Sequence, residues 1–192
     1  WITSGTATDF SANTQTTVLG LFLNNFRDRL YVAGSGAGSI AASAPYRVFY
    51  SALGNGTSWA TASSFDVPNS EGDKISALKV LNDKELILTT NNLFSYNQIS
   101  LKQKSSRVGA YNQEVIEEID GLVYTFCPSG VYVTNGISVK KISEPIEDIL
   151  KNFRPLYDAN NRVVTNTFAF KRGDYYCLYL RSLTGIETST IN

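Results

Sequence analysis

Two groups of carboxylates come closest, in type and spacing, to residues that could do chemistry. The groups are Glu114, Glu117, Glu118 and Asp120, and then Glu144, Glu147 and Asp148. Two carboxylates about 5 to 9 Å apart can hydrolyse a glycosidic bond, and several together can hold Ca²⁺. Neither group has the alternating Asp spacing of a calcium loop. We therefore interpret both as solvated strand edges and helix starts.

The sequence offers no base for a nucleophile, because it contains no histidine. This excludes Ser-His-Asp and Cys-His catalysis and the usual zinc hydrolase sites. Cys127 and Cys177 lie inside apolar strand patterns and not at metal-ligand spacing, so we expect two buried free thiols. The sequence thus predicts no catalytic residue, no cofactor and no metal site, and the chain is not expected to be an enzyme.

Two short motifs resemble known sites but have simpler explanations. Glycines alternate with small residues from Gly34 to Ser39, as in loops that cradle phosphate. The Lys-Ser/Thr of a P-loop is missing, and a flexible insertion is the better interpretation. Asn55-Gly56-Thr57 fits the N-glycosylation pattern, but Asn-Gly is also a favoured hairpin dipeptide, so we expect a turn.

Basic and aromatic residues occur together in one part of the chain, and single-stranded nucleic acid is bound by such mixtures. These residues are Arg27, Arg29, Tyr31, Tyr46 and Arg47. On strands they would alternate with apolar residues and point to water or to a neighbouring subunit. Lys plus Arg and Asp plus Glu both number 17, so no net charge steers the chain onto DNA, and sequence-specific nucleic-acid binding is not expected.

Composition bounds the remaining possibilities. Charged residues make up 18% of the chain and aromatic residues 12%, which favours a β-rich body largely covered by neighbours. No apolar run reaches the roughly 18 residues of a membrane-spanning helix, so no membrane span is expected. The chain begins at Trp1 and contains no Met, which suggests a processed chain or part of a longer one.

The stretch from Glu118 to Ser143 shows the organising pattern. Apolar and polar residues alternate, and turn residues interrupt them at Pro128-Ser129-Gly130 and Asn135-Gly136. Period-two alternation broken by such turns is typical of consecutive β-hairpins. Together with Asn112 to Asp120 and Ile137 to Ser143, which also have strand character, it gives four short strands, the content of one propeller blade or half of a sandwich.

Similar patterns recur along the chain, so we predict an all-β fold of β-propeller-like repeats, each a four-stranded antiparallel blade, three complete and a fourth partial. A short helix is expected near 146–153, where apolar residues have helical spacing after Pro145. Because so few blades do not close a ring, missing blades from a longer chain or a sandwich remain open alternatives. The predicted units are an extended lead-in at 1–17 and blades within 18–192, at about 18–68, 75–109, 112–143 and, partial, 162–192.

Five segments taken in order resemble the β-propeller region of bacteriophage virion proteins, in particular tail nozzle or stem proteins of short-tailed phages. The resemblance covers roughly Leu19 to Leu180. The segments are FRDRLYVAG (26–34), YRVFYSALGNGTSW (46–59), GDKISALKVLNDKELILTTNNLFSY (72–96), GLVYTFCPSGVYVTNG (121–136) and ISEPIEDIL (142–150).

This resemblance implies a non-enzymatic structural component of the virion, located in the phage tail. It also implies that identical subunits form a ring around the DNA exit channel and contact other tail or portal/adaptor proteins. An alternative is a carbohydrate-binding or carbohydrate-cleaving propeller, in which exposed Trp59, Tyr46 and Tyr111 stack on sugar rings and Glu117 and Glu118 supply the chemistry. A cellular propeller scaffold is a third hypothesis.

Overall fold

The computed structural model describes residues 22–34, 45–60, 63–68, 73–151, 153 and 167–180. The described chain is mostly β, in three four-stranded antiparallel sheets and one two-stranded pair. In each sheet the strands lie side by side in chain order, so every neighbouring pair is a hairpin. The predicted all-β fold of repeated four-stranded units, three complete and one partial, is confirmed. The lead-in predicted at 1–17 lies outside the described residues.

The first sheet contains a long connection between its third and fourth strands. Its second strand, RLYVA, is largely buried. Its register places Tyr31 opposite Tyr50 and Val32 opposite Phe49, so aromatic and β-branched pairs stabilise the sheet. The strands are β1 (Phe22–Phe26), β2 (Arg29–Ala33), β3 (Arg47–Tyr50) and β4 (Ser64–Asp66).

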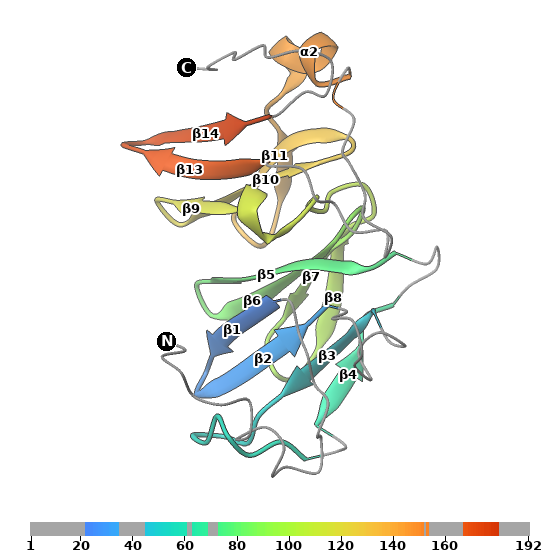
Figure 1. Ribbon diagram of the computed structural model, residues 1–192, viewed down its shortest axis with the longest axis vertical. Helices are drawn as coiled ribbons and strands as arrows, with labels where there is room; N and C mark the ends of the chain where they lie inside the picture. The colour runs from blue at the N-terminus through green and yellow to red at the C-terminus, as the bar shows by residue number, and fades with distance from the viewer. Residues whose placement is uncertain are drawn as a thin grey trace.

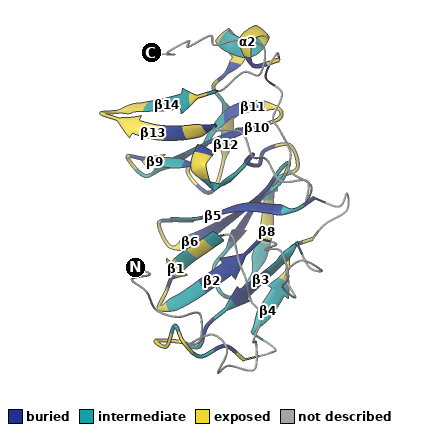
Figure 2. Cartoon of the chain, viewed as in Figure 1, coloured by how far each residue is buried: buried dark blue, intermediate teal, exposed yellow. Residues whose placement is uncertain are grey.

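The second sheet has the most buried strands of the described chain. Residues 85–89 of its second strand are all buried, because this sheet lies between the other two and uses both faces (Figure 2). A β-bulge interrupts the register of its first pair between Ile75 and Ala77. The strands are β5 (Ile75–Leu81), β6 (Lys84–Thr89), β7 (Leu93–Tyr96) and β8 (Leu101–Ser105).

The third sheet is preceded by one short helix and followed by others. The sequence predicted strand character from Asn112 to Asp120, but a 3-10 helix occupies its first part, with the Asn112 side chain accepting a hydrogen bond from the Val115 N–H. The strands are β9 (Glu117–Ile119), β10 (Leu122–Cys127), β11 (Gly130–Thr134) and β12 (Val139–Lys141), and the helices are η2 (Gln113–Val115), η3 (Glu144–Ile146) and α2 (Glu147–Lys151).

The helix expected near 146–153 is confirmed with a slightly earlier start. Pro145 sits in the first turn of η3, where a missing N–H costs nothing, and α2 continues from it. The last unit is the hairpin β13 (Phe168–Arg172) and β14 (Tyr175–Tyr179). It lies beside β9 and η2, at the end of the molecule opposite the first sheet (Figure 1).

The turns between first and second strands use residues with positive φ. Arg27 and Asp28 both have positive φ, and so do Asp120 and Gly121, which is the type I′ geometry that suits a twisted hairpin. The two Asn-Gly dipeptides behave differently, since Asn55 and Asn135 are not in this conformation. The Asn135 side chain accepts hydrogen bonds from the backbone of Ile137 and Ser138, both at 2.9 Å. The favoured dipeptide thus forms an Asx turn and not the expected tight hairpin.

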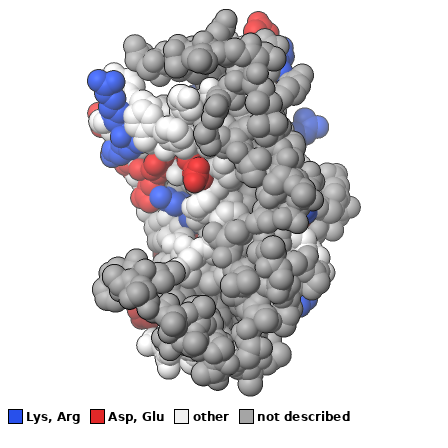
Figure 3. Space-filling view, viewed as in Figure 1, with Lys and Arg blue, Asp and Glu red and all other residues white. Residues whose placement is uncertain are grey.

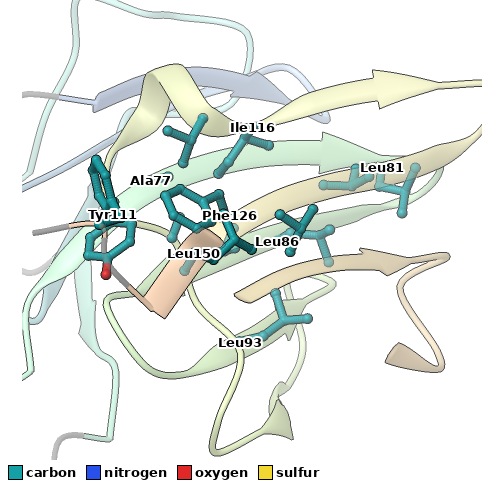
Figure 4. Packing of buried hydrophobic residues seen from close by; sticks show 14 residues of the cluster. Ala77, Leu81, Leu86, Leu93, Tyr111, Ile116, Phe126 and Leu150 are labelled. Carbon is teal, nitrogen blue, oxygen red and sulfur yellow. The ribbon is translucent and has the colours of Figure 1, made fainter. Parts of the chain in front are cut away.

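Two apolar clusters join the sheets face to face. We call the contact between the β1–β4 and β5–β8 sheets the first interface, and that between the β5–β8 and β9–β12 sheets the second interface. The apolar cluster of the first interface, the first cluster, includes Ile87, and that of the second interface, the second cluster, includes Leu86. These neighbouring residues of β6 face opposite sheets because side chains alternate along a strand. Figure 4 shows Leu86, Phe126 and Leu150 converging in the second interface.

The segment between the second and third sheets passes very close to the end of β6. A Cβ atom on Gly109 would lie 2.1 Å from the carbonyl oxygen of Thr89, so only glycine fits. The Ala110 N–H bonds to that same carbonyl at 2.9 Å, and the Thr125 hydroxyl donates to the Gly109 carbonyl at 2.8 Å. The connection is therefore part of the joint and not a free linker.

The sheets follow one another in a stack (Figure 1), and within the described residues they do not close into a ring. Across that same part of the chain, no helix is long and apolar enough to cross a membrane.

Candidate functional site

The carboxylate groups singled out from the sequence are spread over strand ends and the first helical turns. Asp120 forms an ion pair with Lys171 at 3.8 Å, and Glu147 pairs with Lys141 at 3.1 Å. Asp148 pairs with Lys151 at 3.2 Å on the surface of α2. Figure 3 shows acidic side chains gathered at the left edge of one face, with basic side chains close by. These contacts support the interpretation of both groups as solvated edges.

The cations near aromatic residues are engaged inside the chain. Arg27 pairs with Asp83 of the neighbouring sheet and lies over the Phe26 ring. Arg47 makes two hydrogen bonds to Asp66, at 2.5 and 2.9 Å. The remaining member, Arg29, donates to the Ser51 carbonyl at 2.6 Å and lies over the Tyr50 ring.

These contacts change the electrostatics of the pairs. The hydrogen bond from Arg27 lowers the pKa of Asp83, and the bond from Arg47 likewise lowers the pKa of Asp66. Tyr31 is buried between the first two sheets, and this burial raises its pKa. Arg27 thus links the first two sheets, while Arg29 and Arg47 are engaged within the first sheet.

Both cysteines are free thiols, as the sequence predicted, but only one is fully buried. Cys127 lies in the interior with its sulfur 3.2 Å from the Ser129 hydroxyl, whereas Cys177 is half-buried on β14. Among the described residues, no three carboxylate or thiol side chains gather in a way that could hold a metal ion.

The aromatic residues proposed to stack on sugar rings are mostly hidden. Trp59 is 3% exposed and donates its indole N–H to the Gly56 carbonyl, while Tyr111 is 9% exposed and packs on Phe126. Only Tyr46 is partly accessible. The expectation that Trp59 and Tyr111 are exposed is therefore wrong, because the interior packing of the sheets takes up both rings.

The two short motifs have separate outcomes. Asn55 accepts hydrogen bonds from the backbone and hydroxyl of Thr57, so this segment is a turn, as expected. The glycine-rich stretch lies outside the described residues except for Gly34, which has a φ of 87°.

The exposed side of the β13–β14 hairpin carries four exposed aromatic side chains. We call it the aromatic face. Alternation puts these residues on one side of the pair, and the rings of Phe168 and Tyr179 stack with centroids 5.0 Å apart. Tyr175 is 66% exposed. Its members are Phe168, Phe170, Tyr175 and Tyr179, with Cys177 paired opposite Phe170 and the exposed Arg172 paired opposite Tyr175.

The other side of the same hairpin is firmly docked on the third sheet. Ala169 is buried and Leu178 packs against the second cluster. The Tyr176 ring stacks on Tyr124 at 5.5 Å, and its hydroxyl donates to the Val115 carbonyl at 2.7 Å. Burial raises the pKa of Tyr176 well above its usual value. The aromatic face is therefore presented on a fixed support.

Two buried carboxylates, Asp73 and Glu85, and one half-buried amide, Gln113, were missed from the sequence. Asp73 accepts hydrogen bonds at the β6–β7 turn from Thr89, from the Asn91 N–H and from the Asn92 side chain. Gln113 bonds to both backbone groups of Leu78, accepting at 2.8 Å and donating at 3.0 Å. Glu85 is buried in the first interface. The one sequence signal for the burial of Glu85 is its position directly before the apolar run Leu86-Ile87-Leu88.

The stacked four-stranded antiparallel sheets define a β-propeller-like fold, and comparison with solved structures agrees. The chain is similar to BamB from Moraxella catarrhalis, a β-propeller, with a TM-score of 0.51 and 12% sequence identity over 91% of the chain. The chain spans about half of that structure, 51% of its length. No family model matches the sequence, and no curated protein matches it significantly.

Proposed function

We propose that this chain is a non-enzymatic structural component of a phage tail, of the nozzle or stem type, and that it assembles with identical copies around the DNA exit channel. The observation that carries the assembly part is the aromatic face of β13 and β14, which exposes four aromatic rings and is docked on the third sheet by its other side. The sequence resemblance described above supports the location in a tail.

The stacking of the sheets gives the physical reason for a partner. Each of the first three sheets packs an apolar face on its neighbour, and repeat units of this kind do not bury their faces alone. The hairpin is a two-stranded unit with one docked and one open face. Exposed apolar patches on soluble proteins mark interaction sites when they are large and contiguous. A second copy of the chain is the partner we propose.

Sedimentation velocity over a range of protein concentrations tests the assembly. The wild type should form a larger species, and Phe170→Ser combined with Tyr175→Ser should be monomeric at the same concentrations. The matched control is Ile99→Ser combined with Ile137→Ser, which removes two other highly exposed apolar side chains outside the face. A monomeric wild type, or equal loss of assembly in the control, would contradict the assembly part of the proposal.

The tail location needs its own experiment. Gold-labelled antibodies against this chain should decorate tails of the intact phage particles in electron micrographs, at the end where DNA leaves. Decoration of cell fractions but not of particles would favour a cellular scaffold. Binding of the purified chain to a glycan array, abolished by Tyr46→Ala, would favour the carbohydrate hypothesis.

A further inference from the structure

Glu85 is a carboxyl group buried in the first interface. Its side chain is 0% exposed on β6. One oxygen, Oε1, accepts a hydrogen bond of 3.1 Å from the Asn24 amide on β1 of the neighbouring sheet. The other oxygen, Oε2, has no hydrogen-bond partner among the described residues. An unpaired buried carboxylate oxygen is costly when charged and much less so when protonated.

The surroundings of Glu85 are aromatic and apolar. Val80 and Tyr96 are its register partners on the two neighbouring strands, and Ile87 follows it on the same face of β6. The titratable and charged groups around it are Tyr31 on β2, Tyr50 on β3, Tyr96 on β7, Arg29 over the Tyr50 ring, Lys84 beside it in sequence, and the Arg27–Asp83 pair at the adjoining turns.

None of these groups forms an ion pair with Glu85 in the described structure. Burial raises the pKa of Glu85 to about 7, and the Asn24 amide opposes that rise. Burial also raises the pKa values of Tyr31 and Tyr96 above the ordinary value of a phenol, so both phenols are neutral at neutral pH. Glu85 is thus the titrating group of this interface near neutral pH.

We propose that protonation of Glu85 controls how tightly the first sheet is held on the second, and that the first interface loosens as the pH rises from 5 to 8. Protonated Glu85 is neutral and suits its buried place. Ionised Glu85 must either remain buried with one bare oxygen or reach water, and it reaches water when β1 and β2 move away from β6.

The direction follows from linkage. The pKa of Glu85 is about 7 in the closed state, whereas a solvated Glu has a pKa near 4.3. The closed state therefore binds the proton more tightly. The stabilisation of the closed state by this proton is complete below about pH 4, decreases as the pH rises, and is lost above about pH 7. From pH 5 to pH 8 the opening equilibrium should increase roughly 70-fold.

Hydrogen exchange measured by mass spectrometry tests this proposal, with rates expressed as protection factors to remove the intrinsic effect of pH. Amides of β1 and β2 should lose roughly 70-fold in protection between pH 5 and pH 8. Amides of β10 and β11, beyond the second interface, should change little. Unchanged protection in β1 and β2, or equal loss in all sheets, would overturn the proposal.

Two variants locate the effect. Glu85→Gln keeps the shape and an acceptor for Asn24 but cannot ionise, so it should remove the pH dependence. Glu118→Gln, an exposed carboxylate on β9, is the matched control and should retain it. Asn24→Ala removes the hydrogen bond that lowers the pKa of Glu85, so the midpoint of the change should move to higher pH. A pH dependence that survives Glu85→Gln would contradict the proposal, and the wild-type measurement decides even if a variant does not fold.

Discussion

The two interfaces of the second sheet differ in chemistry although both are made by the same strands. The first interface is aromatic and contains tyrosine hydroxyls and the carboxyl of Glu85. The second is built of aliphatic side chains around the packed rings of Tyr111, Phe126 and Phe153, and Gln113 makes two hydrogen bonds to the backbone of Leu78 at its edge. In the first interface Glu85 Oε2 has no hydrogen-bond partner among the described residues, whereas the oxygen and the nitrogen of the Gln113 amide both form hydrogen bonds.

Two interfaces of one repeated architecture can therefore differ in stability. Stability in a stack of repeats is a sum of unit and interface contributions, so a weaker interface can open without unfolding the rest. We expect the first interface to open while the second interface stays closed. The aromatic face belongs to the part that stays closed, since the hairpin docks on the third sheet.

Truncation of neighbouring β6 residues should separate the interfaces with the largest effect. Leu86→Ala and Ile87→Ala each leave a cavity at a fully buried site, and each should lower the free energy of unfolding by about 2–5 kcal/mol. Only Ile87→Ala opens space beside Glu85, so only this variant should weaken the pH dependence. Urea unfolding at pH 5 and pH 8 measures both effects. Equal pH dependence in the two variants would contradict the distinction.

The pH dependence of overall stability should be the next largest effect. The pKa of Glu85 is raised to about 7 in the folded chain, so folding is favoured below the unfolded pKa and loses this contribution as the pH rises. The roughly 70-fold change between pH 5 and pH 8 corresponds to a fall of about 2.5 kcal/mol in the free energy of unfolding. Unfolding of the wild type and Glu85→Gln across the pH range checks this, with no fall expected for Glu85→Gln.

Removal of the Gln113 side chain tests the second interface. Gln113→Ala leaves the N–H and carbonyl of Leu78 without these hydrogen bonds, and should cost about 1–3 kcal/mol at every pH. The control is Gln103→Ala, whose side chain lies at the exposed edge of its sheet and should change stability by less than about 0.5 kcal/mol. A loss of stability confined to high pH would mean that Gln113 supports the first interface and not the second.

The smallest effect should come from the exposed ion pair across the first interface. Arg27→Ala removes the pairing with Asp83 at the turn ends, where water and salt screen the charges. Thermal unfolding should shift less than for Gln113→Ala, and the shift should vanish at high salt. A large, salt-independent shift would mean that this turn holds the sheets together more strongly than the buried clusters do.

The sequence predicted much of the fold because alternation and turn residues act locally. The hairpins β10–β11 and β13–β14 lie where period-two patterns placed them, and Pro145 marked the start of a helix. Local signals failed where a side chain competed for the backbone. Asn112 caps a 3-10 helix in place of a predicted strand, and Asn135 forms an Asx turn in place of a tight hairpin.

The site was less predictable because it depends on which face of each element is covered. Trp59 and Phe170 both read as aromatic residues near strands, yet one is buried and the other exposed. Glu85 and Glu118 are both strand carboxylates, and only the neighbouring sheet makes Glu85 buried. Such differences arise from tertiary packing, which no local pattern in one chain encodes.

Another copy is proposed to cover the aromatic face, and the two cysteines provide a direct test of this contact. Cys177 lies on this face, while Cys127 is buried inside the third sheet as an internal reference. The rate of alkylation of each thiol can be followed by peptide mass spectrometry as the protein concentration increases. We expect alkylation of Cys177 to slow as the copies assemble and Cys127 to remain protected throughout. A Cys177 rate that does not change while larger species form would contradict the account.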